Sequence, residues 1–382
     1  MLKAIRIHTR NLFLVPLLVC MASCTLFSKK QNLVVGYIDA FSGTRAMFGV
    51  STRSGIQMAI DELNAQGGLR GQKIDLKIYD DEGIPQKAEK VAGQLLKEHP
   101  NVLAVLGASA SSRSLLMAPI FQKQEIPMVT SSSTHPKVTA AGDYIFRVCF
   151  VDTFQGPVMA EFLIKSLKIK KAAILRDIST QYSLTLSEFF KKRFIRTGGE
   201  VVSDQTYQSG DVDFGSQLKA LKKHRPQVVY VPGYYSDVGR IVLQARQEGI
   251  ASMFVGGDGW DSPDLLNVVE DRLNGAYFTS HFSPDNEDPT YLLFKKNYVA
   301  RYGRPPDAFS ALGYDAAGVL IAGMKKTKTL SPSGIRDEIA KTKNYSGVTG
   351  KISLDKNRNA IKPVVILKIE DKKIKIVTSI TP

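Results

Sequence analysis

Two groups of hydroxyl side chains each follow a short apolar run in the first half of the chain. Ser109, Ser111 and Ser112 come after the run that opens AVLGASASSRS, and Thr130–Thr134 come after the run that opens IPMVTSSSTHP. Each run is typical of a buried strand, so both groups fall where a strand ends in a loop. Hydroxyls and free backbone N–H groups suit a carboxylate. The pattern predicts an anion site shared by two loops.

Two loops in the second half offer complementary groups. Gly233-Tyr234-Tyr235 adds aromatic rings after the run QVVYV, and Gly256-Gly257-Asp258-Gly259-Trp260 adds one carboxylate among glycines. A single carboxylate in such a place suits an ammonium group. Together, the hydroxyl donors, the acid and the aromatic rings describe a site for a free amino acid.

Each of these loops also has a purely structural interpretation. Ser and Thr groups after strands are often helix caps, and Asp258 is placed to cap a helix that begins after Pro263. The functional interpretation depends on all four loops lying at equivalent strand ends, which is where ligands bind to parallel sheets.

Catalysis has little support in the sequence, and we expect no enzyme activity. Residues 107–111 (GASAS) lack the last glycine of the nucleophile elbow G-x-S-x-G. The 5 histidines show no metal-ligand spacing, so neither a metal nor another cofactor is expected. His135, beside the second hydroxyl group, is the one plausible base.

The elements that must position these loops alternate between strand and helix along most of the chain. Runs such as Leu33–Phe41, Ala172–Asp177 and Gln227–Gly233 indicate strands, and apolar residues at helical spacing indicate helices between them. This alternation predicts right-handed βαβ crossovers and open parallel sheets. One sheet would need too many strands, so two α/β lobes are expected. The strand-forming stretch Val364–Val377 alternates Ile/Val with Lys, which suits an exposed sheet edge.

The composition of the 382 residues is that of a globular protein, with 43% hydrophobic and 23% charged residues. The formal net charge is +15, but the basic residues are interleaved with acidic ones, which indicates a solvated basic surface. No nucleic-acid-binding motif accompanies the charge, so no nucleic-acid partner is expected. Cys149 is the single cysteine beyond the leader, and we expect it to be buried and inert.

The first residues have the organisation of a secretory leader. Three basic residues precede the apolar run Leu12–Met21, which is too short to span a bilayer. Ala22-Ser23-Cys24 resembles a bacterial lipobox, in which the cysteine is diacylated and becomes the new N-terminus. Met21 stands where such signals usually have Leu.

We therefore expect a lipoprotein signal peptide over residues 1–23 and a short tether over residues 24–32. The lipid on Cys24 would hold the protein on a membrane surface in the periplasm or cell envelope, without spanning the membrane. The competing interpretation is an ordinary cleaved signal peptide with an incidental cysteine.

From Leu33 to its end, the chain resembles the type I periplasmic solute-binding proteins of the branched-chain (Leu/Ile/Val) amino acid ABC transporters. The matching stretches are VVGYIDAFSGTRAMFG, GIQMAIDELNAQGGLRGQKIDLKIYDDEG, VLGASASSRS, PMVTSSSTHP, YIFRVCFVDTFQGPVMAEF, VVYVPGYYSDVGRIVLQARQEGI, FVGGDGW and AFSALGYDAA. The resemblance implies an α/β fold of two Rossmann-like lobes with parallel sheets, joined by three hinge crossings. The first lobe would comprise residues 33–151 and 282–345, and the second residues 152–281 and 346–382.

The resemblance also implies a ligand site between the lobes. The hydroxyl that binds the α-carboxylate would be that of Ser111, assisted by Thr134. The ammonium group would be held by the backbone of Ser132 and by the carboxylate of Asp258. Aromatic side chains would close over the ligand and line the pocket, and these are Tyr182, Tyr234, Phe48, Phe309 and Trp260.

Two positions depart from the family pattern. The cysteine that some members carry after the YDD stretch is absent, so no disulfide is expected there. Arg113 stands where a small residue is common. Either it faces solvent, or it adds a positive charge near the cleft that favours an acidic ligand.

The resulting prediction is an extracytoplasmic lipoprotein that captures an amino acid, expected to be aliphatic or branched-chain, and delivers it as a monomer to an ABC permease. The alternatives keep the fold and change the role, either to a sensor that presents its ligand to a membrane partner, or to a receptor for amides, urea or aromatic acids. Asp258 discriminates between the ligand classes, because a ligand without an ammonium has no use for a buried carboxylate.

Overall fold

A computed structural model describes residues 31–382, which include a folded unit over Asn32–Pro382. The predicted signal peptide, the proposed lipidation site Cys24 and nearly all of the tether lie outside the described residues. Within residues 31–382, no helix is both long enough and apolar enough to cross a membrane.

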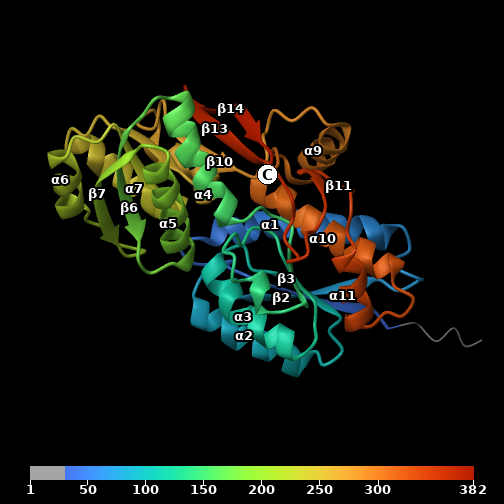
Figure 1. Ribbon diagram of the computed structural model, residues 1–382. Coiled ribbons are helices and arrows are strands. Elements are labelled where there is room, and N and C mark those ends of the chain that lie inside the picture. Colours follow the sequence, from blue (N-terminus) through green and yellow to red (C-terminus); the bar gives the residue numbers. More distant parts are fainter. Residues whose placement is uncertain (1–30) are drawn as a thin grey trace, which may run out of the picture. The chain divides into compact units, whose positions relative to one another are not determined.

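The first lobe is built on a five-stranded parallel sheet of strand order β2-β1-β3-β4-β5. Alternate residues of β1 belong to different cores: Val34 and Ile38 pack with α2 and α3, whereas Val35 and Tyr37 pack with α1, α10 and α11. In Figure 1, α2 and α3 lie on one side of the strands, and α1 and α10 lie on the other. Both faces of the sheet are therefore covered, as a buried parallel sheet requires. The strands are β1 (Leu33–Asp39), β2 (Ile74–Asp80), β3 (Ala104–Gly107), β4 (Met128–Thr130) and β5 (Ile145–Arg147), and the helices are α1 (Ala46–Ala65), α2 (Pro85–Glu98), α3 (Ser111–Lys123), α10 (Ala308–Lys326) and α11 (Pro332–Ala340).

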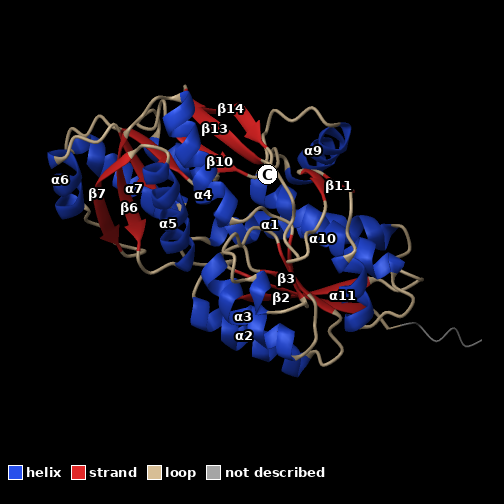
Figure 2. Cartoon of the chain, viewed as in Figure 1, coloured by secondary structure: helices blue, strands red, loops and turns tan. Residues whose placement is uncertain are grey.

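The second lobe is built on a seven-stranded sheet of order β14-β13-β10-β9-β8-β6-β7. Five strands are parallel, namely β6 (Lys171–Asp177), β7 (Glu200–Tyr207), β8 (Val228–Val231), β9 (Met253–Gly256) and β10 (Tyr277–Ser280). Figure 2 shows helices beside these strands. The helices of this lobe are α4 (Asp152–Glu161), α5 (Gln181–Arg196), α6 (Gly215–Lys223), α7 (Tyr235–Gln247) and α8 (Pro263–Val269). The prediction of two α/β lobes with parallel sheets is confirmed.

The stretch Val364–Val377 resolves into parts of two strands, β13 (Val364–Glu370) and β14 (Lys373–Ile380). The turn between them holds Asp371 and Lys372 at φ of 52° and 59°, a geometry that suits the twist of a hairpin. Both strands are antiparallel to their neighbours, so the second sheet is mixed. β14 lies at the edge of the sheet, as its alternating lysines predicted.

A smaller antiparallel pair, β11 (Tyr345–Gly347) and β12 (Gly350–Ile352), precedes the hairpin, and α9 (Pro289–Tyr302) precedes α10. Ile352, Leu354 and Ala360 pack into the same core as β1 and α10. This packing favours a third hinge crossing close to residue 361, later than the predicted boundary at 345. The division into lobes otherwise stays a prediction.

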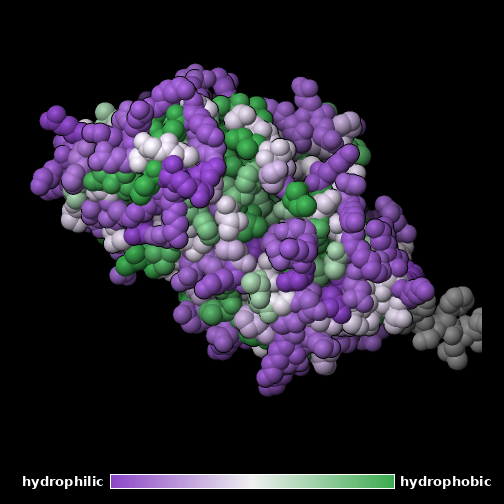
Figure 3. Space-filling model, viewed as in Figure 1, coloured by the Kyte–Doolittle hydropathy of each residue, from purple (hydrophilic) through white to green (hydrophobic). Residues whose placement is uncertain are grey.

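The surface agrees with the interpretation of the charge as a solvated face. In the view of Figure 3, most of the surface is hydrophilic and the apolar atoms lie in separate groups. Basic side chains on this surface pair with acids in several places, for example Lys191 with Asp204 at 2.8 Å and Lys375 with Glu370 at 2.7 Å.

Candidate functional site

The four predicted loops all follow the carboxyl ends of strands. The first two follow β3 and β4, which are neighbours in the first sheet, and the other two follow β8 and β9, which are neighbours in the second. Neighbouring parallel strands place their loops side by side at one edge, so each lobe contributes one pair of loops.

Helix capping does not account for these loops. The N-cap of α3 is Ala110, with no side-chain hydrogen bond to the helix, so the serines around it serve another purpose. The helix that begins at Pro263 is capped by Ser262, whose hydroxyl accepts from the N–H of Asp264 at 3.3 Å. Asp258 is therefore free of the capping role that the sequence had left open.

The hydroxyl side of the site is formed by Ser111, Ser132 and Thr134, all buried. The oxygen of Ser111 accepts from the N–H of His135 at 3.2 Å, which leaves its hydroxyl proton available to a ligand. The hydroxyl of Ser132 donates to the carbonyl of Ser109 at 2.9 Å and so ties the two loops together. Loop β3–α3 and loop β4–β5 are thereby held as one donor surface.

The carboxylate of Asp258 is buried and held from three sides. The side-chain amide of Gln155 and the hydroxyl of Tyr182 donate to Oδ1 at 2.9 and 2.8 Å, and Nε2 of His281 lies 3.0 Å from Oδ2. Burial lowers the pKa of His281, although Asp258 opposes the shift. All three partners of the carboxylate are neutral, so none of them offsets its negative charge. The carboxylate can therefore still pair with a cation.

Gln155 is itself fixed in position. Its side-chain oxygen accepts from the hydroxyl of Thr279 at 2.7 Å and from the backbone N–H of Asp258 at 3.1 Å. Neither Gln155 nor His281 was predicted as a site residue. They lie 103 and 23 residues from Asp258 in the chain, and nothing in their local sequence marks them.

A second buried acid, Asp152, was also missed. Burial, reinforced by the nearby charge of Asp258, raises the pKa of Asp152 to about 7. Thr134 is near enough to lower that pKa, yet its hydroxyl and Oδ2 of Asp152 make no well-aligned hydrogen bond within residues 31–382. Buried polar atoms without partners are uncommon and call for a ligand or water. An ammonium group has three donors, so its chemistry suits these two acids.

Four aromatic rings connect the two lobes. Phe48 stacks on Phe309 with ring centres 4.0 Å apart, and its edge meets Tyr234 of the second lobe at 5.7 Å. Tyr234 in turn stacks on Tyr182 at 5.0 Å. The structure therefore brings together Phe48, Phe309, Tyr182 and Tyr234, and it places Tyr182 directly against Asp258.

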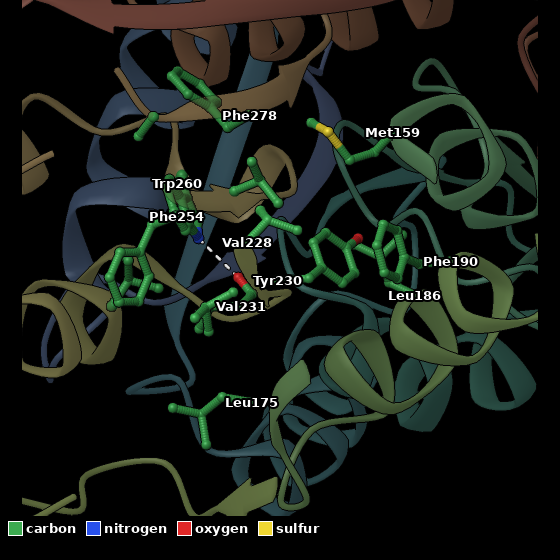
Figure 4. Close-up of a cluster of buried hydrophobic side chains, with 14 of the residues drawn as sticks. Met159, Leu175, Leu186, Phe190, Val228, Tyr230, Val231, Phe254, Trp260 and Phe278 are labelled. Atoms are coloured by element: carbon green, nitrogen blue, oxygen red, sulfur yellow. Dashed lines mark hydrogen bonds between the residues drawn. The ribbon is translucent and has the colours of Figure 1, made fainter. Parts of the chain in front are cut away.

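Trp260 lies elsewhere. Its side chain is buried in the core of the second lobe, where the indole N–H donates to the carbonyl of Val231 at 2.9 Å and the ring lies 6.4 Å from Phe278 (Figure 4). Its backbone belongs to the Asp258 loop, so Trp260 anchors that loop to β8. A role for its side chain in lining the pocket stays a prediction that these contacts do not favour.

Arg113 does not face solvent, so that expectation was wrong, and the alternative, that its charge favours an acidic ligand, stays a prediction that its two ion pairs do not favour. Its side chain is 1% exposed and lies 2.7 Å from carboxylate oxygens of both Asp39 and Asp81. It also donates to the hydroxyl of Ser109 at 3.0 Å. Burial raises the pKa of Asp81, and the guanidinium opposes that shift. Arg113 is thus neutralised inside the lobe, and it holds the β3–α3 loop from behind.

His135, the candidate base, is also engaged in structure. Its Nδ1 accepts from the N–H of Lys137 at 3.1 Å. Burial and the neighbouring Arg147 lower its pKa to about 4, so the imidazole is neutral near pH 7.

Comparison with known proteins agrees with this geometry. The family model described as periplasmic binding protein matches residues 32–373. The chain belongs to the periplasmic binding protein family. A leucine-, isoleucine-, valine-, threonine- and alanine-binding protein of Pseudomonas aeruginosa is 28% identical over 326 residues, which cover 85% of this chain and 86% of that protein.

Two solved structures of periplasmic binding proteins are similar over nearly their whole length. A leucine-binding protein of Thermotoga maritima has 34% identity and a TM-score of 0.88, covering 92% of this chain and 99% of the other. The branched-chain amino acid substrate-binding protein of Streptococcus pneumoniae, solved with isoleucine, has 30% identity and a TM-score of 0.86, covering 92% and 100%. These likenesses extend across both lobes and all four loops.

The Arg113 cluster generates a stability prediction. Arg113→Met leaves Asp39 and Asp81 buried without a counter-ion, and it should lower the free energy of unfolding by about 3–5 kcal/mol. Arg301→Met, which removes the exposed pair with Asp61, is the matched control and should cost about 1 kcal/mol or less. Urea unfolding followed by circular dichroism measures both. Equal losses in the two variants would contradict a structural role for Arg113.

Proposed function

We propose that this protein captures a free aliphatic amino acid, of the leucine, isoleucine or valine kind, between its lobes and delivers it to an ABC permease. The observation that carries the proposal is the pair of buried acids, Asp258 and Asp152, which both bond to Gln155, with the hydroxyl of Thr134 beside Asp152. The names of the relatives support the ligand class: one is a leucine-, isoleucine-, valine-, threonine- and alanine-binding protein, one is a leucine-binding protein, and one was solved with isoleucine.

The roles of the residues follow from their chemistry. Ser111 and Thr134 donate to the α-carboxylate, while Asp258, together with the backbone of Ser132, accepts from the ammonium. The side chain of the ligand is enclosed by four aromatic residues, which keep water away from it: Phe48, Phe309, Tyr182 and Tyr234. Because the charge of Arg113 is neutralised by Asp39 and Asp81, it does not bias the site toward acidic ligands.

These contacts are sufficient for a useful affinity. Hydrogen bonds to charged groups contribute roughly 1.5–3 kcal/mol each. Three or four of them, with burial of an apolar side chain, reach the roughly 8 kcal/mol of a micromolar complex. Since the donors and the acids belong to different lobes, the ligand stabilises the closed form, and closure is a hinge motion.

The alternative ligands are less well matched to this site. Amides, urea and aromatic acids have no ammonium, so they would leave the Asp258 carboxylate buried without a cation. A sensor that binds an amino acid remains compatible with the same geometry. Transport is favoured because the named relatives include a substrate-binding protein of a branched-chain amino acid transporter.

The ammonium assignment leads to a direct prediction. Asp258→Asn keeps the shape of the side chain but removes its charge, and it should weaken leucine binding at least tenfold, or roughly 1.4 kcal/mol. Asp271→Asn, an exposed acid of the same lobe, is the matched control and should bind as the wild type does. Isothermal titration calorimetry measures both, after a thermal-shift screen of the amino acids has chosen the best ligand. Unchanged affinity in Asp258→Asn would refute the assignment.

The proposal includes a lipid anchor at Cys24 on the outer side of the cytoplasmic membrane or elsewhere in the envelope. Its support is the leader sequence and its Ala-Ser-Cys ending. A tethered receptor stays close to its permease, and this raises its effective concentration there.

The anchor is tested by expression in a bacterial host supplied with a radioactive fatty acid. The wild-type protein should incorporate the label and sediment with membranes, whereas Cys24→Ala should be unlabelled and soluble. Cys20→Ala is the control and should behave as wild type. Label and membrane association that persist in Cys24→Ala would exclude this anchor.

A further inference from the structure

Arg45 reaches from the first lobe into a group of acids on the second. It precedes α1 as its N-cap residue, in the loop that follows β1, and its side chain makes no capping bond. Its guanidinium bonds the hydroxyl of Ser209 and lies 3.8 Å from the carboxylate of Asp177. The side chains of Arg45 and Asp177 are 11% and 1% exposed, so the pair is largely removed from solvent.

The receiving group on the second lobe is held by hydrogen bonds within that lobe. Asp177 ends β6, and its Oδ1 accepts from the N–H groups of Ser179 at 2.9 Å and Ser209 at 3.1 Å. Asp237 lies beside it, with Oδ1 accepting from the N–H of Gly210 at 3.1 Å. Oδ2 of Asp237 and the hydroxyl of Tyr207 are buried without a partner in the described part of the chain.

The two buried carboxylates need a cation, and Arg45 supplies one. Asp177 and Asp237 are both buried, and Arg240 of the same lobe lies 3.8 Å from Asp237. A buried carboxylate without a counter-charge is strongly unfavourable. Arg45 is the cation that the first lobe supplies, and it opposes the rise that burial causes in the pKa of Asp237.

Arg45 also touches the ligand-enclosing rings. Its guanidinium lies over the ring of Tyr234, 4.4 Å from the centre. Tyr234 stacks on Tyr182, whose hydroxyl donates to Asp258 at 2.8 Å. A continuous series of contacts thus joins the cross-lobe ion pair to the carboxylate proposed to hold the ammonium.

Resting on the proposed function, we infer that Arg45 is a cross-lobe positioning residue: through Asp177 and Ser209 it stabilises the closed form, and over Tyr234 it holds the aromatic wall against the ligand. It touches no ligand group itself. It determines how slowly an amino acid leaves, because the ion pair must break before the lobes part. The neighbouring contacts of Thr44 with Tyr235 at 3.2 Å and Ser112 with Gln181 at 3.1 Å add neutral bonds to the same seam.

The first arm of the test measures closure without any ligand. Spin labels on Lys97→Cys of α2 and Lys219→Cys of α6, both exposed, report the distance between the lobes. Residues 25–382 are used, since Asn32–Pro382 forms one folded unit. The remaining thiol, Cys149, is buried with its pKa raised to about 12, so it resists labelling. Arg45→Met should shift the ligand-free distances toward longer values than in the wild type.

The second arm measures the release of leucine by stopped-flow fluorescence. Arg45→Met should release leucine roughly tenfold faster than the wild type, with a smaller change in the association rate. Arg45→Lys keeps the charge but loses the planar stacking on Tyr234. Its release rate should therefore lie between those of the wild type and Arg45→Met. The double variant with Arg45→Met and Ser209→Ala should release leucine less than twofold faster than Arg45→Met alone, because both changes break the same contact.

Arg53→Met is the matched control. Arg53 is an exposed arginine of α1, the helix that Arg45 precedes. Its guanidinium lies 5.7 Å from the ring of Phe41 within its own lobe. It should leave both the distances and the release rate as in the wild type, and the ligand-free melting temperatures of the two methionine variants should agree.

The outcomes separate the two proposals. Distances and release rates in Arg45→Met that match the wild type and Arg53→Met would overturn the role of Arg45. If the wild type binds no amino acid, the proposed function fails, and the ligand-free distances alone decide whether Arg45 holds the lobes together. If Arg45→Met does not fold, the same comparison is made with Arg45→Lys and Ser209→Ala.

Discussion

A buried carboxylate is costly unless a cation pairs with it, and Asp258 is such a group. Gln155 and Tyr182 orient it, and His281 lies against its second oxygen, but all three are neutral partners. Desolvation in this region is strong enough to raise the pKa of the adjacent Asp152 to about 7. We propose that an ammonium group supplies the missing positive charge. In this proposal, the binding of a zwitterion, the closure of the lobes and the choice of ligand all follow from that requirement.

The first lobe contributes hydrogen-bond donors rather than charge. Its loops after β3 and β4 are linked by the bond from Ser132 to the carbonyl of Ser109, and Arg113 braces Ser109 from behind. Such a surface is rigid and rich in donors, and it suits a carboxylate without offering a full positive charge. In the proposed function, the ligand links these two half-sites of opposite character and thereby the two lobes. The contact between Arg45 and Asp177 likewise pairs a buried carboxylate of one lobe with a positive charge from the other.

The features of the fold and the site that the sequence could predict are those that depend on local pattern. Apolar runs ending in Ser, Thr or Gly located the loops after β3, β4, β8 and β9, because the carboxyl ends of parallel strands share an edge. The alternation of lysines located the edge strand β14. A family resemblance supplied roles for Ser111, Thr134, Tyr182 and Tyr234, and the structure brings those tyrosines together.

The parts that sequence could not predict depend on contacts between distant residues. Arg113 looks like a surface residue on its own helix, and only the meeting of β1 and β2 places Asp39 and Asp81 around it. Gln155 and His281 acquire their roles because α4 and β10 converge on the Asp258 loop. Trp260 follows Asp258 closely in sequence, but its side chain turns into the core because the carbonyl of Val231 accepts its N–H.

The central claim is that the buried acids await an ammonium, and calorimetric titration with leucine and with 4-methylpentanoate tests it most directly. The two compounds share a carboxylate and an isobutyl group, and they differ in the amine alone. We expect 4-methylpentanoate, which lacks the amine, to bind at least a hundredfold more weakly than leucine, or by roughly 2.7 kcal/mol. Equal affinity for the two compounds would contradict it.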